Sequence, residues 1–147
     1  MENYDVLIVG GGAAGMAAAL AAAEKGRRVL LADREPALGG VLRQCVHSGF
    51  GRHVFGEDLT GVEYGRRYAE AVAASDVTVW TGAEVLALTP ERTALLSSRA
   101  GLARVGFGAC VLAAGCREAV WKFPEETGFY QPIVAARTGS DGSGAGE

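Results

Sequence analysis

The run GGGAAG at residues 10–15 places three glycines in the spacing GxGxxG, directly after a short apolar segment. That segment, residues 4–9 (YDVLIV), is typical of a parallel strand that is buried on both faces. Residues 13–24 are nearly all alanine and predict a helix, with Gly26 placed as its C-terminal glycine. The glycines are therefore expected to form a tight turn that leads from a strand into a helix.

Each glycine of the motif has a separate role in binding a pyrophosphate. Gly10 permits the turn out of the strand, Gly12 removes a side chain where a phosphate approaches the backbone, and Gly15 lets the helix pack on the strand. The helix begins near Ala13 and Ala14, where unpaired N–H groups and the positive end of the helix dipole favour negative charge. These residues predict a phosphate site that needs no basic side chain.

A second apolar run at residues 28–33 completes a strand–helix–strand unit of the usual length and ends at Asp33. This acid follows the glycine motif by about 20 residues, where a carboxylate accepts both hydroxyls of an adenosine ribose. A carboxylate there repels a 2′-phosphate and disfavours NADP, although Arg34 lies beside it. We include both residues among the candidate cofactor-binding residues, and FAD and NAD remain open at this point.

The chain beyond Asp33 departs from a regular alternation of strands and helices. Residues 34–61 predict a glycine-rich loop with one helical turn, and residues 64–75 predict an amphipathic helix before a strand at 77–80. Short β-like runs separated by turn sequences then predict an antiparallel meander, at residues 84–88, 93–98 and 102–107. A buried strand at residues 109–115 returns to the main sheet. An NAD-binding domain continues with further βα units, so this order favours FAD.

Residues 3–117 resemble the FAD-binding domain of the pyridine nucleotide-disulphide oxidoreductases, the flavoproteins with two dinucleotide-binding domains. The resemblance is carried by four segments, residues 6–15, 29–33, 33–40 and 110–115. It implies an α/β fold, a Rossmann-like FAD/NAD(P)-binding domain of three layers with a parallel central sheet and an antiparallel β-meander.

The resemblance also implies further contacts with FAD. Gly39 and Gly40 let the chain pass near the ribityl-pyrophosphate region. Ala114 and Gly115 belong to the second FAD contact, where the family commonly has threonine at the position of Ala114. The start of the meander, at Val85, offers backbone groups to the adenine.

The stretch after Gly40 is similar to bacterial FAD-dependent oxidoreductases related to sarcosine oxidase α-type subunits. The dithiol reductases have two cysteines five positions apart here, whereas the positions five residues from Cys45 are Gly40 and Phe50, so a redox dithiol is not expected. Cys45 is interpreted as a packed thiol rather than a thiolate near the flavin. His47 and His53 are interpreted as surface or loop residues rather than proton-transfer groups. No catalytic residue is assigned.

Composition excludes several other classes of protein. The chain has 147 residues, 49% of them hydrophobic and 21% charged, and a net charge of −3 without a basic cluster, which argues against nucleic-acid binding. It has no apolar run of the roughly 20 residues that a membrane span needs, and no secretory signal, so a cytoplasmic location is expected. Three cysteines and two histidines without suitable spacing predict neither a metal site nor a disulfide framework.

The expected organisation is an FAD-binding domain at residues 1–118, followed by a divergent and partly disordered tail at residues 119–147. A second GxGxxG domain for a nicotinamide is missing. The chain is therefore interpreted as the FAD-binding module of a truncated or split oxidoreductase that transfers hydride between a small substrate or NAD(P)H and FAD. A second chain with the nicotinamide or substrate domain is a candidate partner. The alternatives are a fragment of an NAD-binding dehydrogenase and a non-catalytic subunit or remnant.

Overall fold

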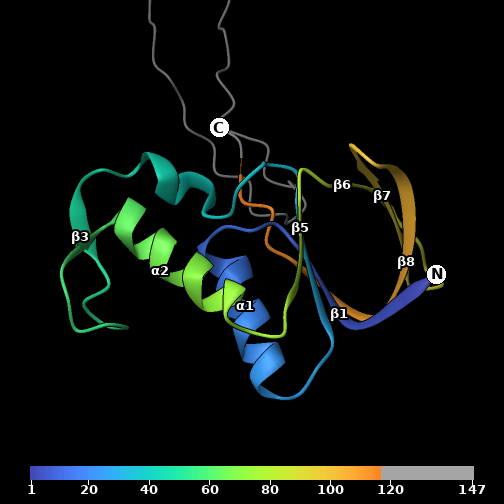
Figure 1. Ribbon diagram of the computed structural model, residues 1–147, viewed down its shortest axis with the longest axis horizontal. Helices are drawn as coiled ribbons and strands as arrows, with labels where there is room; N and C mark the ends of the chain where they lie inside the picture. Colours follow the sequence, from blue (N-terminus) through green and yellow to red (C-terminus); the bar gives the residue numbers. More distant parts are fainter. Residues whose placement is uncertain (117–147) are drawn as a thin grey trace, which may run out of the picture. The chain divides into compact units, whose positions relative to one another are not determined.

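Six strands form one mixed sheet in the computed structural model, which describes residues 1–116 (Figure 1). The strands lie in the order β5 (Thr78–Thr81), β2 (Val29–Asp33), β1 (Glu2–Val9), β8 (Gly101–Leu112), β7 (Thr93–Ser98) and β6 (Glu84–Leu88). Strand β1 runs parallel to β2 and to β8, and β2 runs parallel to β5, whereas β7 is antiparallel to both β8 and β6.

Two crossovers connect the parallel strands on one side of β1. Helix α1 (Ala13–Glu24) joins β1 to β2, and helix α2 (Gly61–Ala73) precedes β5. The connection between β2 and α2 contains the predicted helical turn, a 3-10 helix η1 (Gly40–Gln44). It also contains a two-stranded sheet that sequence patterns did not predict, formed by β3 (Ser48–Phe50) and β4 (Leu59–Thr60).

Helix α1 has the limits that its alanine-rich sequence predicts. It ends at a left-handed glycine, Gly26, whose φ is +68°. The N–H of Gly26 donates to the carbonyl of Ala23 at 2.8 Å, and the N–H of Arg27 donates to the carbonyl of Ala22 at 3.2 Å. This pair of bonds is the Schellman arrangement, which satisfies carbonyl groups that a helix end otherwise leaves unpaired.

Helix α2 begins at Gly61, three positions before the predicted start at Tyr64. The reason is a capping box that precedes the amphipathic pattern. The Thr60 hydroxyl accepts from the Glu63 N–H at 3.2 Å, and the Glu63 carboxylate accepts from the Thr60 N–H at 2.8 Å. Each side chain thus satisfies a backbone donor of the first turn, and the helix starts at the box rather than at its first large apolar residue.

The sheet separates two buried clusters. Side chains of neighbouring residues in a strand point to opposite faces, so Ile8 contributes to the cluster under the helices and Leu7 to the cluster under the meander. Figure 1 shows α1 and α2 on one side of the sheet and β6, β7 and the first part of β8 curving over the other side. Helices, parallel sheet and meander are the three layers, and the predicted fold class is confirmed.

Strand β8 differs from the prediction of two separate runs at 102–107 and 109–115. It is one continuous strand of 12 residues that pairs with β7 at its start and with β1 along most of its length. Gly108 lets β8 continue close beside β1, because a Cβ there would lie 2.8 Å from the carbonyl oxygen of Asp5. The second half of β8 is also less buried than predicted, and Leu112 is 70% exposed, since the pairing with β7 ends at Gly106.

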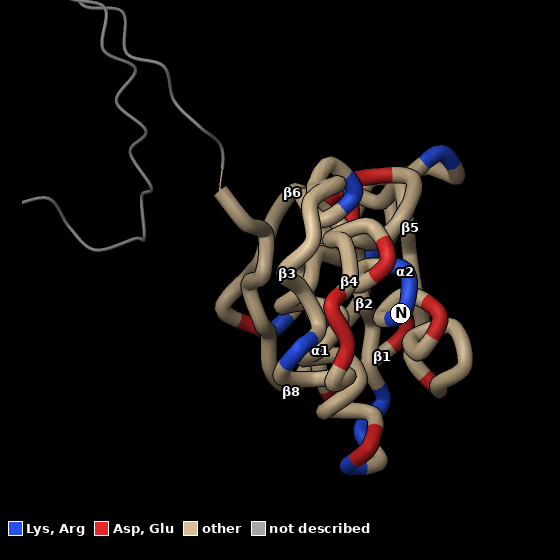
Figure 2. The backbone as a smooth tube through the Cα atoms, turned by 90° about the vertical axis from the view of Figure 1, so that its left-hand side faces the viewer, with Lys and Arg blue, Asp and Glu red and all other residues tan. Residues whose placement is uncertain are grey.

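Residues Met1–Ala114 form one compact unit, and a second unit begins at Gly115. The predicted domain limit at 118 and the predicted tail at 119–147 lie outside the described residues. Within the described part, acidic and basic residues are scattered among one another along the backbone (Figure 2). No helix in that part is long and apolar enough to cross a membrane.

The capping box gives a test of the fold. We expect Thr60→Ala to lower the free energy of unfolding by about 1 kcal/mol, because the Glu63 N–H loses its acceptor. Urea denaturation of the purified chain measures this change. Thr81→Ala is the matched control, since Thr81 is exposed and its hydroxyl has no partner among the described residues. Equal stability of the two variants would contradict a role for the box.

Candidate cofactor-binding site

The candidate site lies where the carboxyl ends of β1, β2 and β8 meet. The order of strands reverses between β1 and β8, and open α/β sheets bind ligands outside the strand ends at such a point. The turn after β1 is held on both sides. The Gly10 N–H donates to the carbonyl of Ala32 in β2, and the Ala113 N–H donates to the carbonyl of Val9, each at 2.8 Å.

Two glycines of the motif are required by the packing of the protein itself. Gly10 has a φ of +107°, and a Cβ there would overlap the carbonyl group of Ala113. A Cβ on Gly15 would overlap the carbonyl oxygen of Gly10, one turn back. Both glycines therefore let α1 start directly against the end of β1, as the sequence pattern predicts.

Gly12 differs from these two glycines. A Cβ at Gly12 would meet no atom within 4 Å, so the packing of the described residues does not explain the glycine. Gly12 is the N-cap of α1, and the first turn of α1 contains no acidic residue. Among residues 1–116, the N–H groups of Gly12, Ala13, Ala14 and Gly15 have no hydrogen-bond partner. Open space thus lies beside unpaired donors at the positive end of a helix, which is an arrangement that binds anions.

Asp33 is a buried acid at the end of β2, with a residue exposure of 8%. Its Oδ2 accepts from the Gly11 N–H at 2.5 Å, and its Oδ1 accepts from the Glu35 N–H at 2.8 Å. Gly11 was not predicted as a site residue, because the motif assigns no task to that position. A Cβ at Gly11 would lie 2.7 Å from Asp33 Oδ2 and would overlap the side chain of Leu38.

The Gly39-Gly40 pair lies directly against the glycine turn. The Gly39 N–H donates to the carbonyl of Gly11 at 2.8 Å. A Cβ on Gly40 would lie 3.1 Å from the Cα of Gly12, and the φ values of Gly39 and Gly40 are +118° and +51°. The structure thus brings together two glycine segments that are far apart in the sequence.

The other candidates on this side of the site are less closely packed. Arg34 is exposed and pairs with Glu35 at 3.6 Å. Val85 in β6 pairs with Leu96 in β7. Ala83, which directly precedes β6, donates its N–H to the Asp33 carbonyl at 2.9 Å. Both residues therefore lie on segments that adjoin Asp33 in the sequence or in space.

Ala114 lies at the end of the compact unit, next to the glycine turn. Its Cα would be 3.0 Å from a Cβ built on Gly10. A small side chain at this position suits so close an approach. Gly115 has a φ of +70° and begins the second unit, so its position relative to the turn is not described.

Candidate reactive groups do not gather around the turn in the described part of the chain. The Cys45 thiol donates to the carbonyl of Val41 at 3.4 Å, and His47 and His53 are exposed. Burial raises the pKa of the Cys110 thiol, which disfavours a reactive thiolate. No group of three or more potential metal ligands occurs in residues 1–116.

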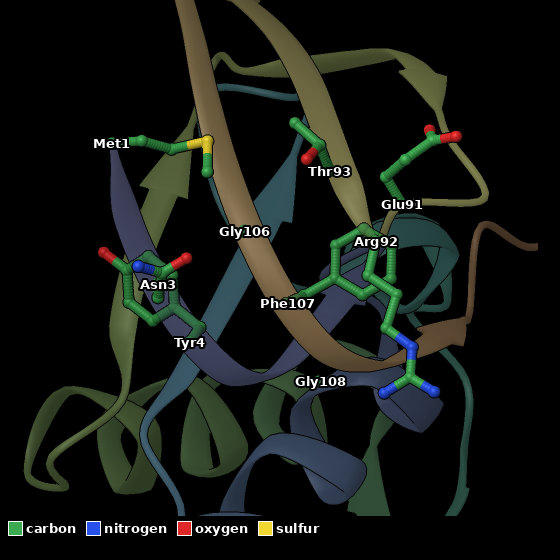
Figure 3. Close-up of a pocket in the computed structure, with 9 residues that line it drawn as sticks. All are labelled: Met1, Asn3, Tyr4, Glu91, Arg92, Thr93, Gly106, Phe107 and Gly108. Atoms are coloured by element: carbon green, nitrogen blue, oxygen red, sulfur yellow. The ribbon is translucent and has the colours of Figure 1, made fainter.

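A shallow hollow of about 340 Å³ lies at the amino end of β1 (Figure 3). Asn3 and Tyr4 line it together with Arg92, Thr93 and Phe107. Because the glycine turn follows the carboxyl end of β1, the hollow is not part of the candidate site.

The contact of Gly15 with Gly10 gives a second test. We expect Gly15→Val to lower the free energy of unfolding by about 1–3 kcal/mol, because the new side chain must displace the turn. Thermal or urea denaturation in the absence of any cofactor measures the effect. Ala14→Val is the control, since Ala14 is exposed and lies in the same turn of α1. A Gly15→Val protein as stable as the control would contradict the packing role.

The sequence matches the model of the FAD dependent oxidoreductase family over residues 5–93. An opine oxidase subunit of Agrobacterium tumefaciens is 36% identical over 128 residues, which are 80% of this chain and 25% of that protein. An alkyl hydroperoxide reductase subunit of Staphylococcus aureus is 32% identical over 117 residues, 73% of this chain and 22% of that protein. The chain thus spans about a quarter or less of the length of these relatives.

Solved structures share the fold at low sequence identity. Thioredoxin reductase of T. acidophilum superimposes with a TM-score of 0.65 at 22% identity, over 81% of this chain and 38% of that one. L-proline dehydrogenase of P. horikoshii gives a TM-score of 0.67 at 21% identity, over 81% of this chain and 24% of that one. The family match confirms FAD as the predicted cofactor. Because that match covers more than half of the chain, including the whole glycine turn, this chain belongs to the family of FAD dependent oxidoreductases.

Proposed function

We propose that this chain binds FAD at the glycine turn and serves as the FAD-binding module of a larger oxidoreductase. The observation that carries the proposal is the start of α1, where N–H groups that are unpaired among residues 1–116 adjoin space that no atom of those residues fills. A fold alone does not define a function, so the proposal depends on this local geometry.

The residues around the turn fit the parts of FAD. The N–H groups of Gly12, Ala13 and Ala14 would hold the pyrophosphate, since they are donors at a helix N-terminus and no acid competes with them. Asp33 would accept from the adenosine ribose. Each of its oxygens already accepts one backbone N–H, and an ionised carboxylate has about four acceptor positions, so two remain.

The remaining predicted residues would complete the site from three other segments. Gly39 and Gly40 pack against the turn and would border the phosphates and the ribityl chain. Arg34, Val85 and the Ala114-Gly115 segment are proposed as further contacts. No side chain of these segments is needed to neutralise the phosphates, because the helix terminus does so.

When FAD is bound, it supplies the hydride chemistry, and the protein supplies binding and orientation. The described residues perform the binding part, and none of them is assigned to proton transfer. The relatives are about four times longer or more, which supports a second segment or a second chain that provides the substrate or nicotinamide site. We propose that the complete enzyme transfers hydride between a small substrate or NAD(P)H and FAD, that this chain alone has little or no turnover, and that it is cytoplasmic.

FAD binding can be tested directly on the purified chain. After incubation with excess FAD and gel filtration, we expect flavin absorbance near roughly 450 nm to elute with the protein. Gly12→Val should leave the chain folded, since a Cβ at this position would meet no atom of the described residues within 4 Å, and should weaken FAD binding at least about tenfold.

Ala21→Val is the matched control for this experiment. Ala21 is exposed on the same helix, beyond the first turn, and the substitution is expected to leave FAD binding unchanged. Absence of bound flavin at saturating FAD would refute the proposal. Equal FAD affinity of Gly12→Val and the wild type would show that the phosphates do not bind at the N-terminus of α1.

A further inference from the structure

Three contacts tie the glycine turn to the loop that follows β2. The Asp33 carboxylate accepts from Gly11, the Gly39 N–H donates to the Gly11 carbonyl, and Gly40 approaches the Cα of Gly12. The first contact joins residues 22 positions apart. We call the Asp33 carboxylate with the N–H groups of Gly11 and Glu35 the Asp33 clamp.

The clamp is buried and is made entirely by the protein. Asp33 is the buried charged residue of the described core, and each of its oxygens has a backbone donor. A hydrogen bond to an ionised carboxylate is about twice as strong as one between neutral groups. Leu38 packs beside the Gly11 position, where even a Cβ would overlap it. The close packing of Asp33 and Leu38 against Gly11 leaves no room for a side chain at this position.

We propose that Asp33 is a positioning residue that fixes the phosphate-binding turn before any cofactor binds. This role rests on the proposed function, because a fixed turn favours phosphate binding only if FAD binds there. The clamp uses the Gly11 N–H, which points back to Asp33, and leaves the next four N–H groups unpaired among residues 1–116. The donors for the phosphates are therefore held in place by contacts within the protein, which reduces the entropy lost on binding.

A similar hydrogen bond elsewhere in the fold provides a control that distinguishes this role from a general effect of losing a carboxylate–backbone bond. The Asp5 carboxylate accepts from the Arg28 N–H at 2.8 Å and joins residues 23 positions apart, also between β1 and the segment that leads into β2. It is exposed and lies at the start of β2, whereas Asp33 lies at the end of that strand. Asp5→Asn is therefore a matched control for Asp33→Asn.

Hydrogen exchange of the FAD-free chain, measured by NMR, tests the clamp. After correction for intrinsic rates, we expect the amides of Gly11 and Glu35 to exchange about 100-fold more slowly than the amide of Gly12. Asp33→Asn should lower the protection of Gly11 or of Glu35 at least about tenfold, because the two N–H groups donate to two different oxygens and an amide has an NH2 group in place of one of them. Asp5→Asn should leave it unchanged.

The clamp is refuted if Gly11 exchanges as fast as Gly12 in the wild type, or if Asp33→Asn has no more effect than Asp5→Asn. Both outcomes are independent of FAD. A chain that fails to bind FAD but protects Gly11 would refute the proposed function and keep the clamp as a structural element.

The positioning role has a separate test that leaves the Asp33 carboxylate intact. Glu35→Pro removes the N–H that donates to Asp33 Oδ1, whereas Glu35→Ala removes the same exposed side chain and keeps that N–H. We expect Glu35→Pro to weaken FAD binding about tenfold relative to Glu35→Ala, with both variants showing wild-type circular dichroism. Equal FAD affinity in the two folded variants would overturn the positioning role. If Glu35→Pro does not fold, hydrogen exchange in Asp33→Asn decides.

Discussion

The parallel pairing of β1 with β2 on one side and with β8 on the other is the constraint on which the site depends. Parallel strands end at the same edge of a sheet, so the segments after these three strands are brought together. The chain reaches that edge at Gly10, Asp33 and Ala113, and the hydrogen bonds of Gly10 and Ala113 fix the spacing between the strand ends. The position of the glycine turn therefore results from strand order before any side chain contributes.

The four glycines at this edge are glycine for different physical reasons, and the spacing GxGxxG does not distinguish these reasons. Protein atoms leave no room for a side chain at Gly10, Gly11 and Gly15, whereas a Cβ at Gly12 would meet no atom of the described residues within 4 Å. The first three glycines are needed for the turn to pack, whereas packing among the described residues does not explain Gly12. The Asp33 carboxylate binds the N–H of Gly11 and leaves the N–H groups of residues 12–15 unpaired among residues 1–116.

Sequence patterns predicted the parts of the fold that depend on local structure, such as both limits of α1 and the strands at 84–88 and 93–98. The early start of α2 was missed although its signal, Thr60 three positions before Glu63, is visible in the sequence. The continuity of β8 and the role of Gly11 were beyond such patterns. Both depend on contacts with residues distant in the chain, Asp5 for Gly108 and Asp33 for Gly11.

The alternation of side chains along the central strands has a consequence for unfolding. Leu7 and Ile8 are neighbours in β1 but belong to opposite buried clusters, and Leu30 and Leu31 do the same in β2. Neither cluster can therefore open without loosening strands that the other needs. The helical layer and the meander layer are expected to melt as one cooperative unit, in which the central strands that precede and follow the glycine turn unfold together with the meander.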